Sequence, residues 1–174
     1  MTHLILGGAR SGKSRYAEQL AVASQQAVSV IVTAQAQDTE MAQRIAHHQA
    51  SRPTHWQVIE SPFDLTTTLQ THAQAGQCLI VDCLTLWLTN LLCQTPAQLQ
   101  QEKDALIAAL PTLPGTILLV SNEIGSGIVP MGELTRQFVD EAGWLNQAAA
   151  GVSERVTLVV AGLPLILKYG SLPV

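Results

Sequence analysis

The stretch GGARSGKS, residues 7–14, has the residue types and the spacing that phosphate binding requires. Gly7 and Gly12 enclose four residues, and Lys13 and Ser14 follow directly, which matches the Walker A pattern in full. Glycines let the backbone approach a phosphate and point several N–H groups at it. Lys13 adds a full positive charge, and the Ser14 hydroxyl can ligate Mg²⁺. The candidate phosphate contacts are Gly7, Gly8, Ala9, Arg10, Ser11, Gly12, Lys13 and Ser14.

Asp82 is the candidate acidic partner of this loop, because it closes the apolar run CLIVD. A carboxylate at a strand end can hold Mg²⁺ directly or through water. We therefore expect Ser14 and Asp82 to be the metal ligands. Asp82 could also cap the helix that follows, and the two roles are compatible. Arg10 and Arg15 flank the loop, where contact with phosphate and exposure to solvent both remain open.

Two adjacent histidines lie in the stretch DTEMAQRIAHHQAS, where the spacing predicts a helix over 38–50. At about 100° per residue, Met41, Ile45 and His48 form an apolar stripe, and His47 lies on a different face with Arg44. We therefore expect His48 to be packed and His47 to meet solvent and ligand. An imidazole near a nucleotide can act as general base, metal ligand or nucleophile. Metal binding is disfavoured, because adjacent histidines point apart, and a histidine without a role is the ordinary alternative.

Short apolar runs alternate with helical patterns along the chain, which predicts an α/β fold. The expected strands are 3–6, 28–33, 55–60, 78–82, 116–121 and 155–162. The expected helices are 13–24, 38–50, 63–75, 84–109 in two pieces divided near Pro96, and 133–149. With the Walker A loop, this order indicates a P-loop NTPase-like fold, a mostly parallel sheet with helices on both faces. Ligands bind at the carboxyl ends of such strands, so the loops that begin at residues 7, 34, 60, 82, 121 and 162 matter most.

Composition narrows the possible classes of protein. The 174 residues suit one nucleotide-binding domain, 1–174, and 47% of them are hydrophobic. The net charge is −4 and Lys and Arg do not cluster, which disfavours a nucleic-acid partner. The apolar runs are shorter than the roughly 18 residues of a membrane span, and the start lacks the basic region of a signal peptide, so we expect a cytoplasmic protein. The three cysteines, Cys78, Cys83 and Cys93, form no CxxC pair and are expected to be buried free thiols.

The stretch SNEIGSGIVP, residues 121–130, follows an expected strand at the same sheet edge. Its glycines and its IVP segment predict a flexible, partly apolar loop, suited to a bulky substrate or a subunit contact. Asn122 and Glu123 are polar residues at the strand end, where site residues are expected. They could equally brace the loop.

Several blocks together resemble one known family. They are GGARSGKS, RIAHHQASRPTHW, the acid-ended strand before LTLWLTNLL, and SNEIGSGIVP with the following LTRQFVDEAGWLNQ. In this order they look like the bifunctional adenosylcobinamide kinase / adenosylcobinamide-phosphate guanylyltransferase family of cobalamin biosynthesis. The resemblance covers residues 3–168. The Walker A pattern is generic, whereas the histidine block and NE-x-G-x-G-IVP are far more specific.

The resemblance implies a two-step activity. A nucleoside triphosphate first phosphorylates the hydroxyl of the aminopropanol arm of adenosylcobinamide. GMP then passes from GTP to adenosylcobinamide phosphate through a GMP-histidine intermediate, which gives adenosyl-GDP-cobinamide and pyrophosphate. The family histidine corresponds to His47, and Lys13 is the other expected catalytic residue. GTP, ATP and Mg²⁺ are the implied cofactors, and a homo-oligomer, with a trimer suggested, is the implied assembly.

Family nucleotide contacts extend beyond the Walker A loop. They correspond to Thr33, Ala34, Gln35, His48, Gln49, Ala50, Ser51, Glu60 and Asp82. Glu60 could accept hydrogen bonds from guanine N1–H and N2–H₂ and so select GTP, or it could be a solvated charge. Family members often carry Glu where this chain has Asp82, and the shorter arm would move the metal or interpose water.

Three rival functions remain at this point. A plain P-loop small-molecule kinase would leave His47 without covalent work, and a monofunctional guanylyltransferase would lack the first step. A GTPase switch is disfavoured, because residues 121–124 replace the base-reading Asn-Lys-x-Asp. The D-x-x-G match at 140–143 lies inside an expected helix.

Overall fold

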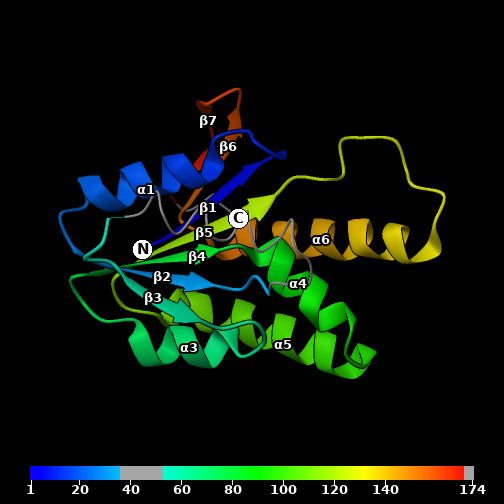
Figure 1. Cartoon of the computed structure of the whole chain (residues 1–174), viewed down its shortest axis with the longest axis horizontal. Helices are drawn as coiled ribbons and strands as arrows, with labels where there is room; N and C mark the ends of the chain where they lie inside the picture. The colour runs from blue at the N-terminus through cyan, green and yellow to red at the C-terminus, as the bar shows by residue number, and fades with distance from the viewer. Residues whose placement is uncertain (36–52, 171–174) are drawn as a thin grey trace.

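The chain forms one seven-stranded sheet flanked by helices, seen in a computed structural model that describes residues 1–35 and 53–170 (Figure 1). The strands are β1 (Thr2–Gly7), β2 (Ala27–Val32), β3 (Gln57–Glu60), β4 (Gln77–Asp82), β5 (Thr116–Asn122), β6 (Arg155–Val160) and β7 (Leu163–Tyr169). The helices are α1 (Lys13–Ala23), α3 (Leu65–His72), α4 (Leu84–Leu92), α5 (Pro96–Ala109) and α6 (Glu133–Val152), with a 3₁₀ turn η1 (Leu110–Thr112). The expected helix over 38–50 lies outside the described residues.

The strand order β3-β2-β4-β5-β1-β6-β7 brings the predicted site loops to one edge. Five of the neighbouring pairs are parallel, and only β6 and β7 pair in antiparallel fashion among the described strands. Gly7 at the end of β1 lies opposite Asn122 of β5, and Asp82 at the end of β4 lies opposite Val32 and Val120. Parallel strands end together, so the carboxyl ends form a common site edge.

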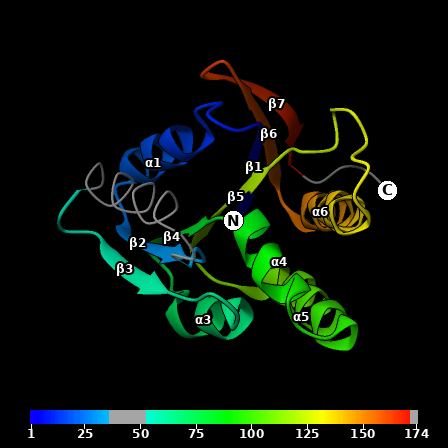
Figure 2. The ribbon, with the colours of Figure 1, turned by 45° about the vertical axis from the view of Figure 1, so that its right-hand side comes forward.

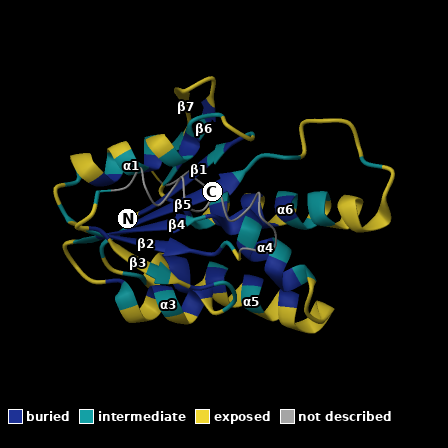
Figure 3. Cartoon of the chain, in the orientation of Figure 1, coloured by how far each residue is buried: buried dark blue, intermediate teal, exposed yellow. Residues whose placement is uncertain are grey.

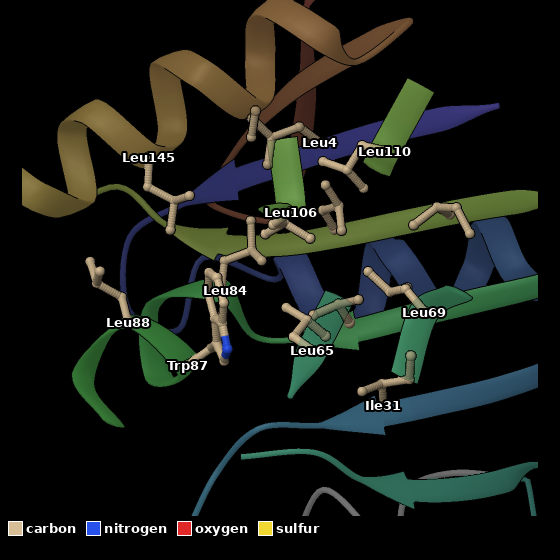
Figure 4. Close-up of a cluster of buried hydrophobic side chains, with 14 of the residues drawn as sticks. Leu4, Ile31, Leu65, Leu69, Leu84, Trp87, Leu88, Leu106, Leu110 and Leu145 are labelled. Carbon is tan, nitrogen blue, oxygen red and sulfur yellow. The ribbon is translucent and has the colours of Figure 1, made fainter. Parts of the chain in front are cut away.

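Helices cover both faces of the sheet, as the sequence predicts. Figure 2 shows α1 on one face and α3, α4, α5 and α6 on the other. Alternation along β1 sends Leu4 into the core under the helices α3 to α6 and Ile5 into the core under α1. In the larger core, Trp87 of α4 is fully buried among leucines, including Leu84 and Leu106 (Figure 4). The apolar segment LTLWLTNLL is therefore largely core.

The expected break near Pro96 is the start of a new helix. Thr95 is the N-cap of α5, and its hydroxyl accepts from the Gln98 backbone N–H at 3.3 Å. The Gln98 side chain accepts in turn from the Thr95 backbone N–H at 3.2 Å, which completes a capping box. Pro96 takes the first helical position, where its missing N–H costs nothing.

Strand β7 was not predicted, and the expected strand 155–162 is too long. The observed strand β6 ends at Val160. Ala161 and Gly162, with φ of 52° and 79°, form the turn between β6 and β7. A two-residue hairpin turn of this kind requires two positive φ values. Ala161 gives no turn signal in the sequence, because alanine rarely adopts that conformation. Figure 3 shows that β7 and the loop after β5 are mostly exposed.

The cysteine prediction is right for two residues and wrong for the third. Cys78 and Cys83 are buried, and burial raises the pKa of each thiol to about 11. Cys93 is exposed, because it is the C-cap residue of α4 and lies beyond the apolar stripe of that helix. All three are free thiols. No helix within 1–35 or 53–170 has the length and apolar character that crossing a bilayer requires.

Candidate nucleotide site

The loop between β1 and α1 has a backbone shape that needs its glycines. Gly12 has a φ of 97°, in the left-handed region that side chains avoid. At Gly7, an added Cβ would lie 2.3 Å from Ser11 Oγ and 2.7 Å from the Val159 carbonyl oxygen. Such distances are shorter than real contacts, so any larger residue at position 7 would force the loop to move. These two positions explain why the Walker A pattern begins and ends its turn with glycine.

Neighbouring elements hold the loop in place. The Glu123 backbone N–H donates to the Gly7 carbonyl at 3.0 Å, which ties the loop to the end of β5. The Gly162 N–H donates to the Ser11 carbonyl at 2.8 Å, which ties it to the β6–β7 turn. Within the loop, the Ser11 N–H donates to the Gly8 carbonyl at 3.2 Å. The loop is therefore preorganised without a ligand.

Helix α1 begins at Lys13 with no side-chain cap from the described residues and no acidic residue in its first turn. Its first N–H groups and its dipole therefore favour an anion. Lys13 is buried, and its Nζ donates to the Gly8 carbonyl at 3.0 Å. Burial lowers the pKa of Lys13, and the nearby Cys83 and Asp82 oppose that shift. A bound phosphate would supply the charge partner that a buried ammonium requires.

A small cavity of about 10 Å³ lies beside Ser14, the last residue of the loop. This volume holds about one water-sized group. Its polar lining comes from Ser14, Glu18 and Asp82, and Val30, Ile80 and Val120 line the rest. Hydroxyl and carboxylate oxygens are the ligands that Mg²⁺ prefers. The expected pair of Ser14 and Asp82 therefore meets at a site of suitable size and chemistry.

Glu18 is a residue of this site that the sequence reasoning missed. It follows Ser14 by four positions on α1, the spacing that places two side chains on one helix face. This spacing from the Walker serine is the signal that could have found it. Across 1–35 and 53–170, no group of three or more His, Cys, Asp or Glu side chains forms a metal site by itself.

The other predicted contacts spread along the carboxyl edge. Thr33 is fully buried, and its hydroxyl donates to the Cys83 carbonyl at 2.7 Å and accepts from the Cys83 N–H at 3.0 Å. Its one hydroxyl donor is thus used to join the ends of β2 and β4. Ala34 is half-buried and Gln35 is exposed. Glu60 ends β3 and is exposed.

Two further alternatives from the sequence are resolved. Asp82 does not cap α4, because it is the last residue of β4 and Cys83 holds the N-cap position. The Glu123 carboxylate braces the following loop, since it accepts from the Gly125 N–H at 2.7 Å and the Ser126 hydroxyl at 3.2 Å.

Arg10 and Arg15 are both exposed. The D-x-x-G match at 140–143 lies within α6, as expected.

Five predicted residues cannot be placed. His47, His48, Gln49, Ala50 and Ser51 lie outside the described residues. Their proposed roles therefore remain predictions.

The parallel sheet, the Walker A loop and the carboxylate at the end of β4 define a P-loop nucleotide-binding protein. Solved structures agree at the level of the fold. A RadB recombinase superposes with a TM-score of 0.50 at 14% identity, over 90% of this chain and 73% of that one. A protein from Pyrococcus horikoshii gives a TM-score of 0.56 at 11% identity, over 99% and 91%. At these identities the likeness concerns the fold alone.

Sequence comparison defines the family. The family model described as cobinamide kinase / cobinamide phosphate guanyltransferase matches residues 3–167. The bifunctional adenosylcobalamin biosynthesis protein CobP of Pseudomonas aeruginosa is 62% identical over 169 residues, which is 97% of this chain and 98% of that protein. The corresponding protein CobU of Salmonella typhimurium is 39% identical over 182 residues, which is 97% of this chain and all of that protein. The chain belongs to this family of bifunctional enzymes, so the resemblance noted from its motifs is confirmed.

Proposed function

We infer that this enzyme phosphorylates adenosylcobinamide with a nucleoside triphosphate and then transfers GMP from GTP to adenosylcobinamide phosphate. The second step passes through GMP bound to His47 and yields adenosyl-GDP-cobinamide. We assign both steps to one nucleotide-binding domain, residues 1–174. The observation that carries the proposal is the convergence of Lys13, Ser14 and Asp82 at one sheet edge in a member of this family.

In guanylyl transfer, an unprotonated nitrogen of His47 attacks the α-phosphorus of GTP. A P–N bond forms, the bond from the α-phosphorus to the bridging oxygen breaks, and pyrophosphate leaves. Lys13 and the loop N–H groups hold the β- and γ-phosphates and stabilise the charge of the leaving group. A phosphate oxygen of adenosylcobinamide phosphate then attacks the same phosphorus. The P–N bond breaks and His47 is regenerated.

The kinase step uses the same loop with a different acceptor. The hydroxyl of the aminopropanol arm attacks the γ-phosphorus of ATP or GTP, loses its proton, and the nucleoside diphosphate leaves. Lys13 would again neutralise the outer phosphates. Ser14 and Asp82 would hold Mg²⁺, which screens phosphate charge when bound. Glu60 would accept from the guanine edge and favour GTP in the second step.

Product analysis tests this proposal against its rivals. Purified enzyme receives adenosylcobinamide with ATP, and then GTP, and the corrinoid products are identified by mass. We expect adenosylcobinamide phosphate first and adenosyl-GDP-cobinamide after GTP. Lys13→Ala should lose both products, and His47→Ala should retain the first and lose the second. A wild type that makes only the phosphate would indicate a plain kinase, and one that acts only on supplied adenosylcobinamide phosphate would indicate a monofunctional guanylyltransferase.

We also propose a homo-oligomer, with a trimer as the expected form. Strand β7 is an edge strand whose residues Leu163, Leu165, Ile166 and Leu167 are all more than half exposed. An exposed apolar edge strand favours pairing or packing with another chain. Ile128 and Met131, in the loop after β5, are each 97% exposed and offer further apolar surface for such a contact.

A further inference from the structure

The end of β5 lies between the two halves of the nucleotide site. The strand order places β5 between β4, which ends in Asp82, and β1, which leads into the Walker A loop. Asn122 lies opposite Gly7, and Val120 lies opposite Asp82. The residue that ends β5 is therefore next to the phosphate loop. It lies two residues beyond Val120, the β5 residue that pairs with Asp82. Asn122 occupies this position.

A buried polar network fixes the backbone of Asn122. Its N–H donates to Thr85 Oγ1 at 2.7 Å, and its carbonyl accepts from Asn146 Nδ2 at 3.1 Å. Ser121 Oγ donates to Asn146 Oδ1 at 2.7 Å and lies 3.3 Å from Thr85 Oγ1. Thr85, Ser121 and Asn146 are all buried, so the two bonds among their side chains are shielded from water, and the two bonds to the Asn122 backbone are partly shielded. The network joins α4, β5 and α6 at one backbone position.

The direction of the Asn122 side chain follows from the pleat. Ser121 points to the sheet face covered by α4 and α6, because it bonds to Asn146 and Thr85. Neighbouring strand residues point to opposite faces, so Val120 and Asn122 point to the α1 face. Val120 lines the cavity that Ser14 and Asp82 share. Asn122 thus faces the same side, one pleat closer to the edge where the phosphates enter.

The amide of Asn122 is available for a ligand. Within 1–35 and 53–170, no residue hydrogen-bonds to this side chain, although both backbone groups of Asn122 are used. The residue is only half-buried. A carboxamide offers two N–H donors without adding charge, and its oxygen can accept from a metal-bound water.

We propose that Asn122 donates a hydrogen bond from its side-chain amide to an outer phosphate of the triphosphate in the Walker A loop. Thr85 and Asn146 are positioning residues that hold Asn122 through its backbone. The inference rests on the proposed function only in taking a triphosphate as the ligand of that loop. It adds a phosphate contact from β5 to those from β1 and α1.

Binding of a non-transferable nucleotide tests the contact. The probe is a GTP analogue with a methylene group between its α- and β-phosphates, measured with Mg²⁺ by calorimetry and by the shift in thermal midpoint. Asn122→Ala should weaken binding about tenfold, the effect of losing one hydrogen bond to a charged group, and should leave the midpoint of the free protein unchanged. Asn122→Asp should weaken it further, because the carboxylate repels the phosphates. Gln147→Ala, on the exposed face of α6, is the matched control.

Affinity of Asn122→Ala within twofold of the wild type would overturn the proposal. The proposal would also be overturned if the thermal midpoint of free Asn122→Ala fell so far that unfolding alone explained the whole loss of affinity. The analogue cannot donate GMP, so this result does not depend on the covalent step at His47. Failure here and failure of the proposed function are thus separate outcomes.

A conservative pair of variants tests the positioning role. Thr85→Val keeps the shape of the side chain and removes the hydroxyl that accepts from the Asn122 N–H, whereas Thr85→Ser keeps it. We expect Thr85→Val to weaken analogue binding and Thr85→Ser to restore it. The double variant Thr85→Val/Asn122→Ala should bind no more weakly than Asn122→Ala, because both act through one contact. Full additivity of the two losses would remove Thr85 from the proposal.

Discussion

Lys13 shows how one buried residue prepares a site for its ligand. Its ammonium group is held against the Gly8 carbonyl in a place where burial lowers its pKa. The charged form is therefore costly until an anion arrives. A bound phosphate would remove that cost, and its attraction to the ammonium would act in surroundings of low dielectric, where it is stronger than in water. In the proposed function, binding and catalysis would therefore use the same buried charge.

His3 gives a prediction at the residue scale. It is buried on β1, its Nε2 lies 2.8 Å from Thr157 Oγ1, and burial followed by repulsion from Arg155 lowers its pKa from 6.5 to about 4. The unfolded chain takes up this proton at higher pH than the folded protein does. The free energy of unfolding should therefore fall below pH 6.5, by about 1.4 kcal/mol per pH unit, until pH reaches about 4.

Urea denaturation at pH 7 and pH 5 measures this loss, which should be about 2 kcal/mol for His3 alone. The variant His3→Gln keeps a hydrogen-bonding group but does not titrate. It should show a pH dependence smaller by that amount. An equal dependence in both proteins would mean that His3 is not held neutral by the fold.

Among the elements, α4 connects the strand ends that border the site. Asn90 donates from Nδ2 to the Thr33 carbonyl at 2.8 Å and to the Pro62 carbonyl at 2.9 Å. Trp87 Nε1 donates to the Phe63 carbonyl at 2.7 Å. These bonds fix the chain just after β2 and just after β3. Helix α4 therefore contributes to the site through backbone position as well as through core packing.

Replacing Asn90 should show how much this connection contributes. Asn90→Ala leaves the buried Thr33 carbonyl and the partly buried Pro62 carbonyl without their donor, so the free energy of unfolding should fall by about 2 to 4 kcal/mol. Urea denaturation measures the change, and Gln94→Ala, at an exposed position after α4, is the control. A loss below about 1 kcal/mol would show that water replaces the amide at no cost.

The elements also show what sequence reasoning can and cannot reach. The Walker A loop is predictable because residues 7–14 carry its whole chemistry locally. Most strands and described helices were placed because each buries a recognisable apolar run. Strand β7 was missed because its apolar residues face solvent on both sides, so it has no amphipathic pattern. Neither the network of Thr85, Ser121 and Asn146 nor the brace at Thr33 has a local signature, because distant segments assemble them.

Within residues 1–35 and 53–170, many of the exposed large apolar side chains belong to β7 and to the loop after β5. Figure 3 shows that both segments are mostly exposed. Leu163 and Leu165 lie on one face of β7, and neither is covered. Burying such surface against another copy of the chain would stabilise an assembly by about 25 cal/mol for each Å² removed from water. This surface is the physical basis for the proposed oligomer.

Sedimentation velocity tests the role of this surface. The wild type should sediment as a homo-oligomer, and Leu163→Asp/Leu165→Asp should sediment as a smaller species, because charge at an apolar contact opposes association. Val22→Asp, at an exposed position on α1, is the control and should leave the assembly intact. An unchanged assembly in the double variant would place the contact elsewhere.

The covalent step at His47 is the central claim, and intact mass after incubation with GTP and Mg²⁺, without corrinoid, tests it most directly. We predict a gain of one GMP, labile to acid, in the wild type and in His48→Ala, and no gain in His47→Ala. A wild type that binds the nucleotide and gains no mass would contradict the mechanism. An adduct that persists in His47→Ala would assign the nucleophile to another residue.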